Sequence, residues 1–276
     1  MMPRVDVLVP VYNSLHVVRP CLRSVQRFTD VSVDRVTILD DGSDSHTAAE
    51  LDSIAEEAGF VVKHSARNQG FVRNCNWGME QTTADLVILL NSDTMVSPGW
   101  VDRFVAAFSI DPTIGVASPI SNFAPHMKIE MVPGMDYLGM QALLDDAEPP
   151  VYPDITTPEG FCFGVSRACM ASIGYFDLVF DDGYGEESDY SMRANNAGFR
   201  TVCVDDLYIY HRGRGTFGSD RRNELNSRNK EIFFARWRPR YARDFEDMKS
   251  RDPLSGRRAL FAEQRKNAGR PAVERA

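Results

Sequence analysis

The chain of 276 residues lacks several features that would place it in a common class. Its longest uninterrupted aliphatic stretch runs only from Leu86 to Leu90, far short of the roughly 20 residues that span a bilayer. The five cysteines are scattered and contain no Cys-x-x-Cys pair, which indicates reduced core thiols and no zinc site. The first residues include no apolar segment of the secretory type. We therefore expect a cytoplasmic protein.

Two nucleotide-binding signatures are also missing. No Gly-x-Gly-x-x-Gly follows the first apolar run, and no Gly-x-x-x-x-Gly-Lys-Ser/Thr occurs anywhere in the chain. These absences argue against a dinucleotide-dependent dehydrogenase and against a P-loop ATPase.

The net charge of −8 is distributed unevenly along the chain. Residues 1–210 carry 13 Lys/Arg and 30 Asp/Glu, a net of −17, whereas residues 211–276 carry 18 and 9, a net of +9. The acidic part argues against a general nucleic-acid binder. The basic part mixes arginine with aromatic residues over 236–243, a composition suited to an anionic membrane surface. Two interpretations stay open: peripheral contact with the inner face of a membrane or a lipid-linked acceptor, and an ordinary solvated helix.

Short apolar strands alternate with helices about five times in the first 110 residues. This alternation predicts an α/β fold with parallel βαβ units and helices on both faces of the sheet. Strands are expected at 5–9 (ended by Pro10), 36–39, 60–62 and 86–90, and helices at 15–27, 44–58, 71–81 and 100–108. Ligands of such sheets bind beyond the carboxyl ends of the strands, so the loops after these strands should carry the chemistry.

The rest of the chain is less regular. Expected helices lie at 135–146, 167–173, 187–197 and 222–249, and expected strands at 160–166 and 200–210. The last 25 or so residues are polar, and we expect them to be loosely held.

Acidic side chains follow two of the early strands, in Asp40-Asp41-Gly42-Ser43 and in Asn91-Ser92-Asp93. Each motif could simply be a turn that caps the next helix. A carboxylate at a strand end can also accept hydrogen bonds from a ribose or a base, or bind a hard divalent cation. Because both strand ends open into the same crevice, the two motifs together predict a site for a nucleotide and a metal ion.

The order of these motifs resembles inverting glycosyltransferase family 2, which has the GT-A fold. The resemblance covers residues 5–218, and six motifs in the family's order carry it. They are Val9-Pro10-Val11-Tyr12-Asn13, Asp40-Asp41-Gly42-Ser43, Asn68-Gln69-Gly70-Phe71 with Asn76, Asn91-Ser92-Asp93, Gly160-Phe161-Cys162-Phe163-Gly164, and Gly183-Tyr184-Gly185-Glu186-Glu187-Ser188-Asp189. Late segments, Tyr210-His211-Arg212-Gly213 and Thr216-Phe217-Gly218, are similar to the family's late histidine and diphosphate loop.

The resemblance implies a role for each strand-end residue. It assigns Asp93 and His211 to a divalent metal, Mg²⁺ or Mn²⁺. The sequence departs from the family's Asp-x-Asp pattern in one position, where Asn91 replaces the first Asp. The residues that it assigns to the nucleotide are Pro10, Tyr12, Asp40, Asp41, Asn68, Gly70, Asn76, Asn91, Ser92 and Arg214.

The resemblance also implies a general base in the acidic motif. Alignment favours Glu187, and Asp189 is the second candidate. A positioned carboxylate that removes the proton of the acceptor hydroxyl gives about 10²–10⁴-fold in rate. One displacement by that hydroxyl inverts the anomeric centre and needs no covalent intermediate.

The expected protein is therefore a metal-dependent inverting hexosyltransferase of bacterial surface polysaccharide synthesis, similar to rhamnosyl-type members of the family. Its expected partners are a UDP- or dTDP-sugar and a glycan or lipid-linked acceptor. Residues 1–218 would form the GT-A domain, with a nucleotide-binding half at 1–119 and an acceptor half at 120–218, followed by a basic helical extension at 219–276. The alternatives are a nucleotidyltransferase and a non-catalytic module that binds sugar nucleotides.

Overall fold

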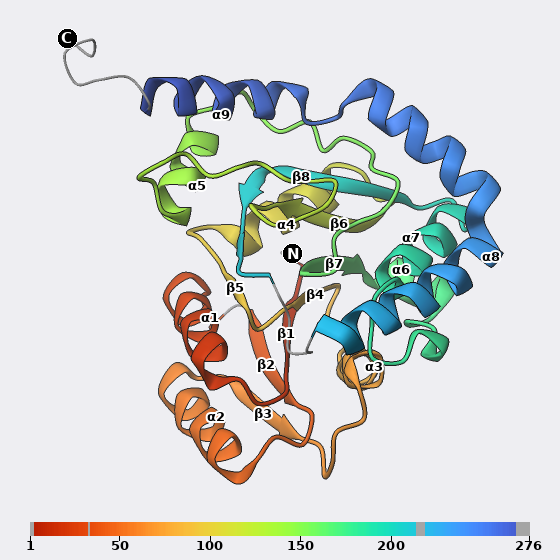
Figure 1. Cartoon of the computed structure of the whole chain (residues 1–276). Coiled ribbons are helices and arrows are strands. Elements are labelled where there is room, and N and C mark those ends of the chain that lie inside the picture. The colour runs from red at the N-terminus through yellow and green to blue at the C-terminus, as the bar shows by residue number, and fades with distance from the viewer. Residues whose placement is uncertain (1–2, 33, 214–218, 269–276) are drawn as a thin grey trace.

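A seven-stranded sheet in the order β3-β2-β1-β4-β7-β6-β8 lies at the centre of the molecule (Figure 1). The computed structural model describes residues 3–32, 34–213 and 219–268. The strands of the sheet are β1 Val5–Val11, β2 Arg35–Asp40, β3 Val61–His64, β4 Leu86–Leu90, β6 Ile114–Ile120, β7 Cys162–Ser166 and β8 Arg200–Tyr208. Two short strands, β5 Thr94–Met95 and β9 Tyr210–His211, pair with each other outside this sheet.

Helices cover both faces of the sheet, and each face has its own apolar core. One face carries α1 Leu15–Phe28, α2 Ser45–Ala58, α4 Trp100–Ile110, α5 Tyr137–Asp145 and α9 Ser255–Ala268. The other carries α3 Phe71–Gln81, α6 Arg167–Ile173, α7 Glu186–Asn196 and the first half of α8 Ser219–Arg251, with the 3₁₀ turn η1 Leu178–Phe180 beside them. The expected α/β architecture is confirmed, because apolar strands buried on both faces need helices on both sides.

The expectation of a parallel sheet holds except at β7. The pairs β1–β2, β1–β4, β2–β3 and β6–β8 are parallel, whereas β7 runs antiparallel to both β4 and β6. β7 follows a long segment, 121–161, whose one helix packs on β8 instead of crossing over the sheet to a parallel strand. Sequence reasoning also missed β6, where Gly115, Ser118 and Pro119 dilute the apolar run.

Pro10 does not end the first strand, as the sequence suggested, because β1 continues to Val11. The pairing of β1 with β4 stops at Leu8, whereas its pairing with β2 continues through Pro10 and Val11. Proline removes one backbone donor, and a strand tolerates this loss where one edge has no partner. Pro10 therefore lies where β1 pairs with β2 on one edge and no longer pairs with β4 on the other.

The expectation of a loosely held C-terminus is wrong for residues 255–268. They form α9, where Phe261 is fully buried and Arg257 pairs with the buried Asp205 at 3.0 Å. The polar composition of this segment did not indicate a packed helix, because residues such as Arg257 and Phe261 contact partners that are far away in the sequence. No helix in the described residues is both long and apolar enough to cross a bilayer.

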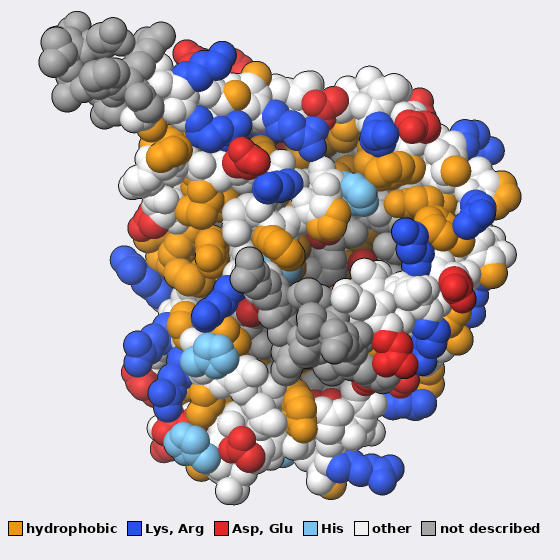
Figure 2. All heavy atoms as spheres, viewed as in Figure 1, with side chains coloured by type: hydrophobic (Ala, Val, Ile, Leu, Met, Phe, Trp, Pro, Cys, Tyr) orange, Lys and Arg blue, Asp and Glu red, His pale blue; other side chains and the backbone are white. Residues whose placement is uncertain are grey.

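The basic segment 236–243 lies within α8, and three of its four arginines have acidic partners on the protein. Arg236 contacts Asp177 and Asp189, and Arg240 and Arg243 both contact Asp244. On the face seen in Figure 2, Lys and Arg side chains are spread among acidic and apolar ones and form no single basic patch. These contacts favour the interpretation of the segment as an ordinary helix over that of a membrane-facing surface.

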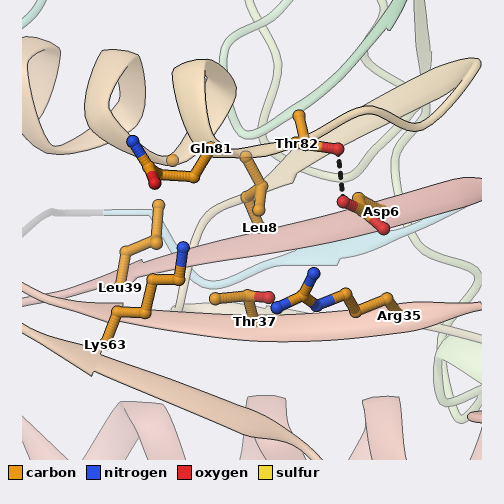
Figure 3. A pocket seen from close by; sticks show the side chains of 9 residues that line it. Asp6, Leu8, Arg35, Thr37, Leu39, Lys63, Gln81 and Thr82 are labelled. Atoms are coloured by element: carbon orange, nitrogen blue, oxygen red, sulfur yellow. Dashed lines mark hydrogen bonds between the residues drawn. The ribbon is translucent and has the colours of Figure 1, made fainter.

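A small cavity of about 10 Å³ lies under α3, on the α3 side of β1, β2 and β3 (Figure 3). Leu8, Thr37, Leu39 and Thr82 are among its lining residues, and Thr82 donates a short hydrogen bond to Asp6 there. This volume has room for about one water molecule. The cavity is therefore a packing feature and too small for a nucleotide.

Candidate active site

The turn after β2 is built around two buried carboxylates, Asp40 and Asp41. Asp40 accepts a hydrogen bond from the Ser43 amide at 3.1 Å, and its other oxygen lies 2.7 Å from Nδ1 of His64. Burial disfavours the His64 cation, but the hydrogen bonds with Asp40 and Asp52 outweigh burial and raise the pKa of His64. Asp40 therefore fixes the turn and β3 relative to each other.

Asp41 holds the predicted nucleotide loop, residues 68–70, through that loop's backbone. Its two oxygens accept hydrogen bonds from the amides of Gln69 at 2.9 Å and Gly70 at 3.0 Å, and the Asn68 side chain also accepts from Gly70. Burial raises the pKa of Asp41, although these two amide hydrogen bonds oppose the rise. Gly70 has a φ of +90°, and a Cβ there would lie 2.7 Å from Asp182. The loop thus needs glycine at this position.

The end of β1 lies beside that turn. The Asn13 amide donates to Ser43 at 2.8 Å, and the Asn13 side chain accepts from the Asp44 amide at 2.9 Å. Pro10 is buried in β1, whereas Tyr12 is 41% exposed. Tyr12 is therefore open to an incoming base, as the prediction for the nucleotide requires.

Asn76 has a structural partner that the sequence did not suggest. Its side chain donates to the Phe176 carbonyl at 2.8 Å and accepts from the Phe176 amide at 3.0 Å. This pair joins α3 to the acceptor half of the chain. Contact of Asn76 with a nucleotide would require the pair to open, so the structure favours a linking role over the predicted nucleotide contact.

Pairing of β5 with β9 brings Asp93 and His211 together. Thr94 lies opposite His211, the Arg212 amide donates to the Asp93 carbonyl at 3.0 Å, and Nε2 of His211 lies 3.4 Å from Oδ1 of Asp93. Both side chains are only 15–17% exposed. Asn91 and Ser92, in the turn before this ribbon, are partly buried.

The surroundings of His211 suit a metal ligand. Its Nδ1 lies 2.9 Å from the Phe123 carbonyl, which can only accept, so Nδ1 carries a hydrogen, and in a neutral His211 the Nε2 lone pair would face Asp93. Phe161 stacks on the ring at 5.0 Å, and Asn122 bonds the backbone amide and carbonyl of His211, both at 2.8 Å. Two acceptors that face each other in this way suit a cation held between them.

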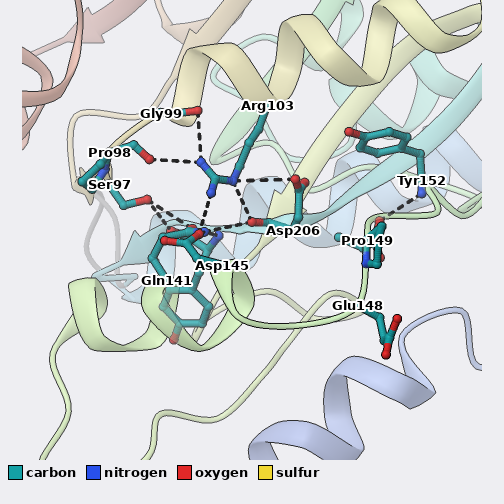
Figure 4. Close-up of polar contacts among 12 residues, drawn as sticks. Ser97, Pro98, Gly99, Arg103, Gln141, Asp145, Glu148, Pro149, Tyr152 and Asp206 are labelled. Carbon is teal, nitrogen blue, oxygen red and sulfur yellow. Dashed lines mark hydrogen bonds and ion pairs between the residues drawn. The ribbon is translucent and has the colours of Figure 1, made fainter.

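Gln141 contacts the segments next to this ribbon, and Figure 4 shows it beside Ser97, Asp145 and Asp206. Its side-chain oxygen accepts from the Tyr208 amide at 2.8 Å and from the Ser97 hydroxyl at 3.2 Å, and its amide donates to Asp145 and to the Asp206 carbonyl. Ser97 follows β5 and Tyr208 precedes β9. Gln141 therefore connects the two segments that carry Asp93 and His211.

Glu186 and Glu187 begin α7, close to the Gly160–Phe161 segment that also contacts His211. A Cβ on Gly160 would lie 3.5 Å from the Glu187 carboxyl, while Phe161 stacks on His211. Glu187 is partly exposed and accepts from the Gly185 amide at 3.2 Å. Glu186 is buried, and its Oε2 has no hydrogen-bond partner among the described residues.

The two glutamates differ in their protonation. Burial and the charge of Glu187 raise the pKa of Glu186 well above its usual range. Burial also raises the pKa of Glu187, but hydrogen bonds to its carboxylate oppose the rise. Glu186 therefore holds its proton more strongly than Glu187 does, and this order leaves Glu187 as the more available base.

Asp189, the second candidate base, lies on another side of α7 and is fully buried. Its carboxylate accepts from Arg193 at 2.9 Å, Arg236 at 3.0 Å and the Trp237 indole at 2.8 Å. A carboxylate with three donors and no exposed surface cannot receive a proton from an acceptor. The structure corrects this prediction: Asp189 anchors α8 to α7.

We expect Asp189→Ala to lower the free energy of unfolding by about 3 kcal/mol, because it leaves Arg193 and Arg236 without their shared carboxylate. Urea unfolding measures this change. Glu246→Ala, which removes an exposed carboxylate from the same part of the chain, should change stability by less than about 1 kcal/mol. Loss of turnover at unchanged stability would return Asp189 to the role of base.

Sequence reasoning did not single out Glu159, a buried acid that directly precedes the Gly160–Phe161 segment. Its carboxylate accepts from the His126 amide at 2.7 Å. Burial raises the pKa of Glu159 from 4.5 to about 7, and the charge of Glu187 adds to the rise while the amide hydrogen bond opposes it. An isolated glutamate in a loop carries no sequence signal for such a position.

The raised pKa of Glu159 makes stability depend on pH. Between pH 4.5 and about 7 the folded protein holds a proton that the unfolded chain releases, so stability falls as pH rises through this range. At pH 8 the loss is about 3 kcal/mol. We expect Glu159→Gln, which cannot ionise, to be more stable than wild type at pH 8 and similar at pH 4.5. Urea unfolding of the metal-free proteins tests this; parallel pH curves would contradict it.

Arg214 and the predicted diphosphate segment Thr216-Phe217-Gly218 lie outside the described residues. The neighbouring Arg212 is exposed beside Asp93. No group of three or more His, Cys, Asp or Glu side chains in the described part of the chain is arranged to hold a metal. A cation at Asp93 and His211 would therefore need further ligands from a substrate, as a diphosphate could provide.

Residues 6–134 match the family model described as glycosyl transferase family 2. Among curated proteins, an N-acetylglucosaminyltransferase of Rhizobium leguminosarum bv. viciae is 30% identical over 118 residues, covering 42% of this chain and 27% of that protein. A poly-beta-1,6-N-acetyl-D-glucosamine synthase of Staphylococcus aureus is 29% identical over 83 residues, covering 30% and 20%. The match therefore spans about a quarter of the length of these relatives.

Two solved structures share the fold over nearly the whole chain. GalNAc-T7 with UDP, GalNAc and Mn²⁺ superposes with a TM-score of 0.67 at 17% identity, covering 95% of this chain and 54% of that one. The mannosyltransferase PcManGT from Pyrobaculum calidifontis, in complex with GDP-Man and Mn²⁺, gives 0.63 at 16% identity, covering 97% and 73%. These likenesses establish a GT-A-like fold.

Proposed function

This chain belongs to glycosyl transferase family 2, and from that membership and the site we propose that it transfers a sugar from a nucleoside-diphosphate sugar to a hydroxyl acceptor with inversion. One observation carries the proposal. A Cβ added at Gly160 would lie 3.5 Å from the Glu187 carboxyl, and the next residue, Phe161, stacks on His211. A base and a metal-ligand pair thus meet at the carboxyl edge of the sheet, where such folds bind nucleotides.

The proton chemistry of the proposed reaction belongs to Glu187. Its carboxylate takes the proton of the acceptor hydroxyl while the acceptor oxygen bonds to the anomeric carbon and the bond from that carbon to the diphosphate breaks. Burial and the charge of Glu187 raise the pKa of Glu186, which favours its protonated form and leaves this proton to Glu187. The nucleoside diphosphate leaves as the second product.

Asp93 and His211 are the residues that would hold Mg²⁺ or Mn²⁺, and their facing acceptor atoms fit such an ion. A divalent ion there would supply positive charge to the leaving diphosphate. Both solved neighbours contain Mn²⁺.

The donor and acceptor are proposed from the relatives. UDP and GDP-Man occupy the solved neighbours, and the curated relatives are named for N-acetylglucosamine transfer. A UDP-sugar is the first donor to test, with dTDP- and GDP-sugars next, and we propose a glycan of the bacterial surface as acceptor.

Release of nucleoside diphosphate tests the function directly. The full chain is incubated with a panel of UDP-, dTDP- and GDP-sugars, with and without Mn²⁺, and the released diphosphate is measured. We expect metal-dependent release from at least one donor. Binding of a donor without release would favour a non-catalytic module, and release of pyrophosphate from a sugar phosphate and a nucleoside triphosphate would favour a nucleotidyltransferase.

A further inference from the structure

The segment just before Glu186 has an unusual backbone. Asp181, Gly183, Tyr184 and Gly185 have φ values of 54°, 109°, 71° and 108°. Asp181 and Tyr184 are in a region that side chains other than glycine rarely adopt, and such conformations persist only where surrounding contacts hold them. The contacts that hold this segment therefore also set where Glu187 points.

Asn229 of α8 makes two of these contacts. Its side chain is fully buried, and its amide group donates to the Phe180 carbonyl at 2.8 Å and to the Gly183 carbonyl at 2.6 Å. These two carbonyls lie on either side of Asp181 and Asp182. The neighbouring Arg228 donates to the Val179 carbonyl at 3.2 Å and lies 3.7 Å from the Asp181 carboxylate.

The other side of the segment contacts the predicted nucleotide loop. The Val72 amide donates to the Asp181 carbonyl at 3.2 Å, and Asp182 lies so close to Gly70 that a Cβ there would be 2.7 Å from its Oδ1. The segment 180–185 is thus held between the start of α3 and α8. Gly70 is also the residue whose amide bonds Asp41.

We propose that Asn229 is a positioning residue that holds segment 180–185 in its strained form and so directs the Glu187 carboxylate toward the acceptor. The role in turnover rests on the proposed glycosyl transfer. The role in holding the segment does not, because it follows from the contacts alone. α8 is then a working part of the active site, although it lies beyond both the family match and the expected catalytic domain.

Removal of the Asn229 amide leaves the Phe180 carbonyl with only the Gly183 amide as donor and takes the side-chain donor from the Gly183 carbonyl, which lets the positive-φ residues relax. The carboxylate of Glu187 would then sample other positions, and small displacements of a reacting group can lower turnover by as much as about 10²-fold. Asp41 and the loop at 68–70 retain their own contacts, so donor binding should hardly change.

The test compares Asn229→Ala with Asn226→Ala, the same change on an exposed position of the same helix. Arg228→Ala is the second variant, because Arg228 is half-exposed and its loss should not prevent folding. Hydrogen–deuterium exchange of the ligand-free proteins follows the amides of 178–190. Initial rates with the active donor then give kcat and donor KM.

We expect amide exchange in 178–190 to be at least about fivefold faster in Asn229→Ala than in wild type, and faster by a smaller factor in Arg228→Ala. Exchange in 178–190 should be unchanged in Asn226→Ala, and exchange in β1–β4 should be unchanged in all three variants. We expect kcat to fall at least about tenfold in Asn229→Ala, with donor KM within about threefold of wild type. If Asn229→Ala does not fold, Arg228→Ala decides alone.

Unchanged exchange in folded Asn229→Ala, or in Arg228→Ala when only it folds, would overturn the proposal. A rise in donor KM that matches the fall in kcat would overturn it as well, because it would assign Asn229 to nucleotide binding. A wild type that releases no nucleoside diphosphate would overturn the proposed function but not the exchange result, so the two failures are distinguishable.

Discussion

Glu187→Gln is expected to lower kcat by about 10²–10⁴-fold while donor KM changes little. Glutamine keeps the size of the side chain and its contact with the Gly185 amide, but it cannot take a proton from the acceptor hydroxyl. Initial rates at saturating acceptor measure the effect. Because burial raises the pKa of Glu187, the wild-type rate should begin to fall on acidification at a higher pH than is usual for a glutamate base.

Glu186→Gln is the matched control for this prediction. The pKa of Glu186 is raised well above its usual range by burial and by the charge of Glu187, which favours the uncharged acid; an amide resembles that form, so kcat should stay within about tenfold of wild type. Should Glu186→Gln abolish transfer while Glu187→Gln retains it, the roles of the two residues would be reversed.

Asp93→Asn is expected to lower kcat at least about 10²-fold and to weaken Mn²⁺ binding strongly. It removes the charged partner of His211, and a divalent ion is worth several kcal/mol to a developing diphosphate charge. Titration of the initial rate with Mn²⁺ measures both effects, and His211→Ala should act in the same direction.

The control for the metal pair is Asp102→Asn, which changes an exposed carboxylate on α4. Its Mn²⁺ dependence should equal that of wild type. An Asp93→Asn enzyme with wild-type Mn²⁺ dependence would show that the ion binds elsewhere, and an active wild type insensitive to chelators would remove the metal from the proposal.

Local patterns predicted most of the fold, because apolar runs and helix boundaries are encoded within a few residues. The helix at 71–81 and the strand at 86–90 were predicted with their observed bounds. The antiparallel direction of β7 and the docking of α9 were not predicted, since both depend on partners far away in the sequence. Tertiary contacts of this kind leave no periodic signal.

The candidate site divides in the same way. Carboxylates and a histidine in ordered motifs could be found from sequence, and the structure brings Asp93 and His211 together. The supporting side-chain amides could not be found from sequence, because such an amide gains its role only from the groups that it contacts. They are those of Asn122, Gln141 and Asn229. For Asp189 a signal existed: residues two apart on a helix point in nearly opposite directions, so Glu187 and Asp189 could not both face the substrate.

The β5–β9 ribbon has a consequence for the order in which the protein becomes functional during translation. A chain leaves the ribosome N-terminus first, so Asp93 is in place long before His211 has been synthesised. A nascent chain that ends before His211 lacks one of the two residues that we propose as metal ligands. By this proposal the metal site can form only after the chain has been made past residue 211, and a fragment limited to residues 6–134 should bind Mn²⁺ poorly.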